Sequence, residues 1–89
     1  MITDMTVHGF FSGESIGKNG QRELYVLATN TKGKTNLHTM KALKFNVPPD
    51  LQQFSNIDVK MSGDVSVYID FGKMVISCRE LQIVPSKHA

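Results

Sequence analysis

Side chains that could carry out chemistry are few in this chain of 89 residues, and they lie far apart in the sequence. The histidines His8, His38 and His88 fall in three different segments, whereas a metal site needs several ligands close together. The single cysteine, Cys78, lies in an apolar run without a neighbouring histidine, so we interpret it as a small buried hydrophobe. The sequence contains no P-loop, no His-Glu-x-x-His and no Cys-x-x-Cys. We therefore expect no enzymatic activity, no metal and no cofactor.

Two other groups of polar residues are equally weak signs of catalysis. The segment Gly13-Glu14-Ser15-Ile16-Gly17 has glycines four apart, but it opens no predicted helix. Asp64 and Asp70 flank one predicted strand, so we expect them at its two ends. That separation disfavours a catalytic pair of carboxylates.

The basic residues are concentrated in the middle of the chain, although the formal net charge is only +2. The range 31–47 holds four lysines and no acid, whereas the range 48–70 holds four acids and one lysine. A local excess of cations is what a small binder of a polyanion needs. The alternative is an ordinary solvated loop. The four lysines are Lys32, Lys34, Lys41 and Lys44.

Apolar residues alternate with polar ones in the first third of the chain, which predicts two strands. The first covers residues 5–13, with Gly9 as the site of a bend or bulge. The second covers residues 22–30, and the Asn19-Gly20 pair before it predicts a hairpin with a type I′ turn. The residues expected to face inward are Met5, Val7, Gly9, Phe11, Leu24, Val26 and Ala28.

The middle of the chain predicts a projecting loop and a third strand. Residues 30–38 are polar and contain glycine, so we expect them to form the loop. Residues 39–47 form the strand, with Leu43, Phe45 and Val47 facing inward, and Pro48-Pro49 ends it. Residues 50–54 are the only candidate for a helix, of one or two turns.

Two apolar runs between Val59 and Val84 predict a closing hairpin, joined at residues 70–73. Residues 57–61 lead into it, and residues 85–89 are expected to fray. Phe45, Phe54 and Phe71 are assigned to the core or to a plug of the barrel. Val65, Val67 and Ile69 are expected to face inward. After the turn, Met74, Ile76 and Cys78 share one face, and Leu81, Ile83 and Val84 complete the apolar tail.

These elements predict one all-β domain over residues 1–89, with five strands and at most one short helix. The five-stranded Greek-key barrel of the OB type fits the pattern best, and an SH3-like barrel is the alternative. No apolar run approaches the roughly 20 residues that span a bilayer, so no membrane association is expected. The first four residues show no signal peptide, and with the lone cysteine this predicts a cytoplasmic location.

Both ends of the chain resemble bacterial single-stranded DNA-binding proteins and the related primosomal replication protein. The resemblance lies in Val7-His8-Gly9-Phe10, in the strand that carries Gly63, and in the run from Lys73 to Val84 after Gly72. Two departures are the absence of tryptophan and the end at Lys87-His88-Ala89, without an acidic glycine-rich tail. The resemblance therefore implies the small phage or plasmid type, which includes a filamentous-phage form that binds as a dimer.

Single-strand binding requires a positive groove and exposed rings on which bases stack. Strand alternation predicts that Tyr25 and Lys44 face outward on neighbouring strands, and this pair is the strongest candidate. Phe10 and Tyr68 have the alternative of a dimer contact or, for Phe10, of covering the barrel end. The candidate nucleic-acid-binding residues are Tyr25, Lys44, Lys32, Lys34, Lys41, Arg22, Lys18, Phe10 and Tyr68.

The expected function is non-enzymatic, sequence-tolerant binding of single-stranded DNA by a homodimer or larger homo-oligomer. Such a protein would coat replication or recombination intermediates, in the host cytoplasm if it is viral, with replication proteins as further partners. The alternative is a small β-barrel adaptor, a protein-interaction or oligomeric module that binds no nucleic acid.

Overall fold

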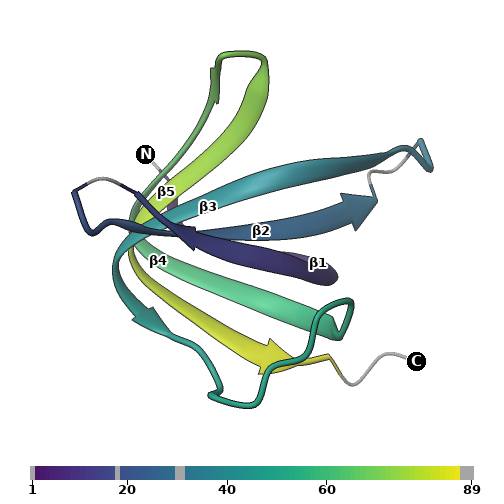
Figure 1. The fold of residues 1–89 in the computed structure, drawn as a ribbon. Helices are drawn as coiled ribbons and strands as arrows, with labels where there is room; N and C mark the ends of the chain where they lie inside the picture. Colours follow the sequence, from purple (N-terminus) through teal and green to yellow (C-terminus); the bar gives the residue numbers. More distant parts are fainter. Residues whose placement is uncertain (1, 18, 30–31, 87–89) are drawn as a thin grey trace.

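The computed structural model describes residues 2–17, 19–29 and 32–86, and these form a closed barrel of five strands (Figure 1). The order around the barrel is β1-β2-β3-β5-β4, and β4 pairs back onto β1. β3 and β5 run parallel, and the other neighbours are antiparallel. This topology is the OB-type Greek-key barrel, so the predicted fold is confirmed. The strands are β1 (Ile2–Ile16), β2 (Arg22–Thr29), β3 (Thr35–Asn46), β4 (Asn56–Asp70) and β5 (Lys73–Pro85).

The core lies inside the barrel and follows the predicted alternation in β1 and β2. Leu24 and Val26 are fully buried, and Gly9 and Phe11 are buried on β1. Cys78 is also buried, which confirms its role as a small core residue. The buried cluster consists of Phe11, Leu24, Val26, Met40, Ile57, Val59, Met61, Val65, Ile76, Cys78, Leu81 and Ile83.

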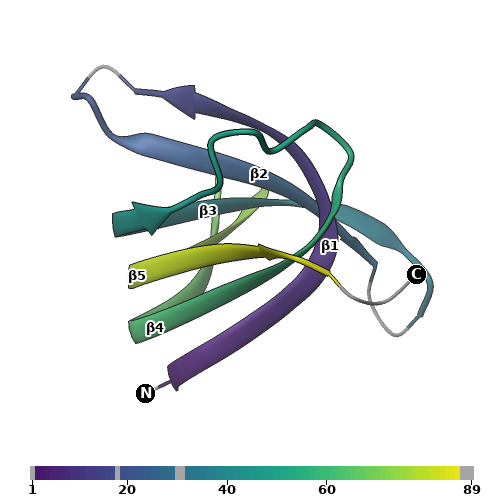
Figure 2. The same ribbon diagram turned by 90° about the horizontal axis from the view of Figure 1, so that it is seen from below.

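β1 bends so that it closes the barrel on both sides (Figure 2). Its residues 2–10 pair with β4, and its residues 10–16 pair with β2. Gly9 lies where β1 changes partner from β4 to β2. A Cβ on Gly9 would lie 2.3 Å from the carbonyl oxygen of Leu27, so only glycine permits this close approach of β1 to β2. The register shift of β1 against β2 comes slightly later, between Phe11 and Gly13.

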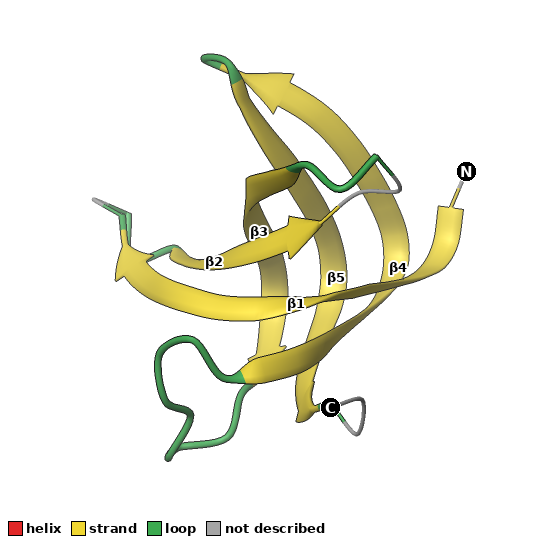
Figure 3. Cartoon of the chain, turned by 90° about the vertical axis from the view of Figure 1, so that its right-hand side faces the viewer, coloured by secondary structure: helices red, strands yellow, loops and turns green. Residues whose placement is uncertain are grey.

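No helix occurs among the described residues, and the expected helix at 50–54 is instead a pair of turns (Figure 3). The Leu51 N–H donates to the Pro48 carbonyl, and the Ser55 N–H donates to the Gln52 carbonyl. The segment is also tied to β1, because the Phe54 N–H donates to the Phe11 carbonyl. A helix this short is only marginally stable by itself, and these hydrogen bonds favour an irregular loop instead. No described helix is long and apolar enough to cross a membrane.

The hairpin connections differ from the predicted ones in detail. After β1, the Gly20 N–H donates to the Gly17 carbonyl, so Asn19 and Gly20 are the last two residues of the turn and not the central pair of a type I′ turn. The loop expected over 30–38 is shorter, because β3 starts at Thr35 and continues the ladder with β2. At the other end, Pro85 still belongs to β5, and residues 87–89 lie outside the described residues.

The prediction for Leu43 was wrong, because this side chain is 85% exposed. Met40 is fully buried, and Ala42 and Phe45 both pack against the core although they are three residues apart. The alternation of β3 therefore breaks between Ala42 and Phe45, and Leu43 has no Cα partner on β5. Phe45 and Val47 pack against the core as predicted.

The end of the β4–β5 hairpin projects beyond the barrel, which makes the inward assignment of Val67 and Ile69 wrong (Figure 1). They are 44% and 73% exposed, because β1 pairs with β4 only as far as Val65. Phe54 and Phe71 were likewise assigned to the core or a plug, but they are 61% and 96% exposed. Both lie in turns, outside the strands that enclose the core.

Candidate nucleic-acid interface

Two adjoining hollows lie between the outer face of β2 and β3 and the projecting β4–β5 hairpin. They share Thr39 and Lys73, and we call them together the hairpin groove. The smaller hollow, of about 150 Å³, is lined by Glu23, Tyr25, Thr39, Lys41, Asp70, Phe71, Lys73 and Val75. The larger, of about 390 Å³, is lined by Asn36, Leu37, Thr39, Ile69, Gly72, Lys73 and Met74.

Tyr25 faces outward into the hairpin groove, as its position between two buried residues predicted. It is half-buried, not freely exposed, because its neighbours hold the phenol. The Tyr25 O–H donates to Glu23 Oε2 at 3.3 Å, and Ser15 Oγ lies 2.8 Å from the Tyr25 hydroxyl oxygen. The ring is therefore positioned before any ligand arrives, which lowers the entropy cost of stacking a base on it.

Phe71 lines the same hollow from the opposite element, the tip of the β4–β5 hairpin. It has φ 51° and the next residue, Gly72, has φ 76°, the two positive values of a type I′ turn. A bulky residue at positive φ is unfavourable, and Asn or Gly fits this position better. Folding therefore gives no reason for an aromatic ring here. Sequence reasoning missed Phe71, although its place inside a turn signal already argued for the surface.

The cations of the hairpin groove are Lys41 and Lys73. Lys41 Nζ lies 3.5 Å from Glu23 Oε1, so part of its charge is neutralised. Lys73 is exposed and makes no ion pair within 4.0 Å with any described residue. Lys41 was a predicted site residue and Lys73 was not. The position of Lys73 beside β2 and β3 depends on how the β4–β5 hairpin folds over these strands.

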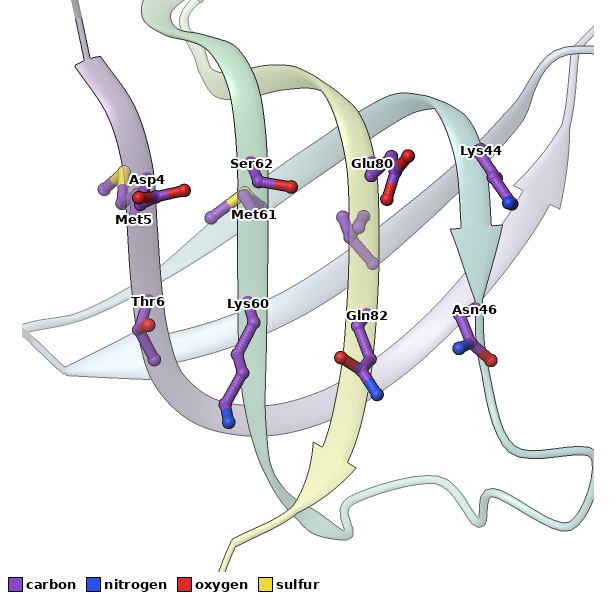
Figure 4. A pocket seen from close by; sticks show the side chains of 11 residues that line it. Asp4, Met5, Thr6, Lys44, Asn46, Lys60, Met61, Ser62, Glu80 and Gln82 are labelled. Carbon is purple, nitrogen blue, oxygen red and sulfur yellow. The ribbon is translucent and has the colours of Figure 1, made fainter.

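Lys44, the predicted partner of Tyr25, instead lies in a separate hollow of about 350 Å³ on the sheet formed by β1, β4, β5 and β3 (Figure 4). We call it the polar hollow. It carries two acids and two lysines but no aromatic residue, so it offers no surface for stacking. Strand pairing arranges its polar side chains in two rows, Asp4–Ser62–Glu80–Lys44 and Thr6–Lys60–Gln82–Asn46.

The remaining predicted site residues that the structure describes lie outside the hairpin groove and the polar hollow. Lys32 and Lys34 are exposed in the turn between β2 and β3. Arg22 donates from Nε to Glu14 Oε2 at 2.5 Å, and its guanidinium lies 5.6 Å from the centre of the Phe45 ring. Phe10 is 46% exposed and pairs with Leu27, and Tyr68 is 41% exposed and pairs with Val75. Lys18 lies outside the described residues.

The serine, the cysteine and the possible metal ligands that could suggest catalysis lie in positions typical of structural residues. Gly13–Gly17 matches Gly-x-Ser-x-Gly, but Ser15 lies within β1 beside the Tyr25 hydroxyl, and no helix follows it in the part of the chain that the structure describes. Burial raises the pKa of the Cys78 thiol, against a smaller opposing effect of a hydrogen bond with the Ser62 backbone, so the thiol stays protonated at neutral pH. Within the described ranges, no three His, Cys, Asp or Glu residues gather to hold a metal ion.

Comparison with known proteins identifies structural relatives but no sequence family. No protein-family model matches the chain, and no curated protein matches it significantly. The mitochondrial single-stranded DNA-binding protein Rim1 of S. cerevisiae shares 10% identity and a TM-score of 0.54 over 97% of this chain and 99% of its own. The N-terminal domain of PriB from Thermoanaerobacter tencongensis, solved in a dimeric structure, shares 10% identity and a TM-score of 0.50 over 94% and 98%. These likenesses establish the barrel fold.

Proposed function

We propose that this protein binds single-stranded DNA without catalysis and that the strand lies in the hairpin groove. The observation that carries the proposal is the meeting of Tyr25 and Phe71, from two different elements, in one hollow with Lys41 and Lys73. Rings stack on bases and ammonium groups bind phosphates, so the hollow holds both chemistries that sequence-tolerant binding needs. That the structurally similar Rim1 is a single-stranded DNA-binding protein supports this assignment.

Binding in this groove would depend on ring faces more than on charge. Glu23 offsets Lys41, and the formal net charge of the whole chain is only +2. Each subunit therefore releases few counterions, and the salt dependence of its affinity should be shallow but measurable. The decisive experiment titrates fluorescent oligo(dT) with the protein at two salt concentrations. We expect saturable binding that weakens at the higher salt, and no binding at low salt would favour the adaptor function instead.

The finer role we propose is the coating of replication or recombination intermediates of a phage or plasmid, in the cytoplasm of the host and alongside replication proteins. Its support is the resemblance of both ends of the sequence to bacterial single-stranded DNA-binding proteins and to the primosomal replication protein. Finding the gene within phage or plasmid genomes, beside replication genes, would test it, and a consistently chromosomal location among unrelated genes would contradict it.

We further propose that two copies pair through β1. Residues 2–8 of β1 pair with β4 on one side, and no described strand pairs with their other edge. An open edge is a template for strand addition, and a two-fold axis lets the same edge serve both copies. The dimeric structure of the PriB domain supports an oligomer on this fold. Two linked grooves would also raise the avidity of a weak single-site binder.

A further inference from the structure

The hairpin groove contains two carboxylates, Glu23 and Asp70, beside its two lysines. A carboxylate repels the phosphates of a nucleic acid, so a groove that only tracks the backbone gains nothing from it. Glu23 is the better placed of the two, because its neighbours hold it in one position. Lys41 Nζ lies 3.5 Å from one oxygen, and the Tyr25 hydroxyl donates to the other at 3.3 Å.

Glu23 keeps the capacity to bind a base. Each carboxylate oxygen accepts two hydrogen bonds, and among the described residues only one contact is made to each. Its side chain is 27% exposed and lines the hollow directly. The Tyr25 hydroxyl donates to this carboxylate from the rim of the ring, so the carboxylate lies beside the surface on which a base would stack.

A carboxylate distinguishes the bases by their donors. Guanine presents two adjacent donors, N1–H and the N2 amino group, which match the two oxygens of a carboxylate. Thymine presents a single N3–H between two carbonyl oxygens, and these repel a carboxylate. Adenine and cytosine each present an amino group beside a ring nitrogen that accepts. Guanine is therefore the base that fits best and thymine the one that fits worst.

We propose that Glu23 reads the base stacked on Tyr25 and gives the groove a preference for guanine over thymine. The inference rests on the proposed function and adds base discrimination to it. It requires no new element, because the acceptor, the stacking ring and the lysine lie on neighbouring positions of β2 and β3.

The test titrates three fluorescent 12-mers: all thymine, thymine with two central guanines, and the same oligomer with inosine, which lacks the N2 amino group. We expect the guanine oligomer to bind at least about fivefold more tightly than all-thymine, with inosine in between. Glu23→Gln should remove this preference and strengthen all-thymine binding, because a negative charge leaves the groove while an acceptor for Tyr25 remains. Glu80→Gln, in the polar hollow, is the matched control and should keep the preference.

Two results would overturn the inference. Equal affinity of the wild type for guanine and thymine oligomers would show that no base is read. A guanine preference that survives Glu23→Gln, as it would if the variant bound every oligomer more tightly by the same factor, would show that Glu23 serves only as a partner of Lys41 and Tyr25. In these cases the proposed function stands. Failure to bind any of the oligomers at low salt would instead refute the proposed function itself.

Discussion

At the scale of single residues, Phe71 combines two properties that folding does not favour together. Its ring is 96% exposed, and its backbone has positive φ at the first central position of a type I′ turn. We expect Phe71→Asn to relieve this strain and raise the free energy of unfolding by about 1 kcal/mol. The same change should weaken oligo(dT) binding about tenfold, because one stacking surface is lost. Thermal unfolding and an oligonucleotide titration measure the two effects.

Phe54 provides the matched control for this prediction. It is also exposed with positive φ, but it lies in the connection between β3 and β4 and outside the hairpin groove. Phe54→Asn should therefore raise stability in the same way and leave the affinity unchanged. If Phe71→Asn also left the affinity unchanged, Phe71 would have no part in binding.

Tyr25 is expected to act through its ring, while its hydroxyl serves to position that ring. Tyr25→Phe keeps the stacking surface but loses the hydrogen bonds with Ser15 and Glu23, so it should cost about 1 kcal/mol of stability. That loss lowers Tm by about 4–8 °C in a domain of this size, with little change in affinity. Tyr25→Ala should weaken binding about ten- to a hundredfold. An affinity of Tyr25→Ala equal to that of the wild type would contradict the stacking role.

At the scale of elements, we expect the β4–β5 hairpin to contact a phosphate of the bound strand, whereas the polar hollow is expected to make no such contact. Lys73 lies in the hairpin groove and Lys44 in the polar hollow, so the two lysines form a matched pair. Lys73→Gln should weaken binding to any sequence and reduce the salt slope by about one unit, whereas Lys44→Gln should change neither. The reverse outcome, measured by titration over a salt series, would place the strand across the polar hollow.

At the scale of the whole molecule, an open edge on β1 predicts a dimer. Light scattering at micromolar concentration should give about twice the monomer mass of 9.9 kDa. The apolar residues Met5 and Val7, which are only partly buried on β1, would gain cover in such a pairing. A monomer mass under these conditions would contradict both the pairing and the avidity argument built on it.

The alternation of apolar and polar residues predicted the barrel because most strands are paired with a neighbour along most of their length. It failed for Val67 and Ile69, since their exposure depends on where β1 stops pairing with β4. It failed for Leu43 because β3 breaks its alternation there. In the candidate site, Tyr25 followed from its strand position and Lys41 from the cluster of lysines in the middle of the chain. Phe71 and Lys73 could not be predicted, because their place depends on how the hairpin folds over the sheet.

The bend of β1 around Gly9 also sets the order in which the barrel can form. The second half of β1 pairs with β2, which follows it directly, but the first half waits for β4, and its pair His8–Asp58 is separated by 50 positions. During synthesis on the ribosome, the first hairpin can therefore form while the start of β1 has no partner on either edge. Barrels dominated by such distant pairings refold in about milliseconds to seconds, slowly for a domain this small. In that interval the start of β1 is exposed to mispairing, and it offers a segment to which a chaperone could bind.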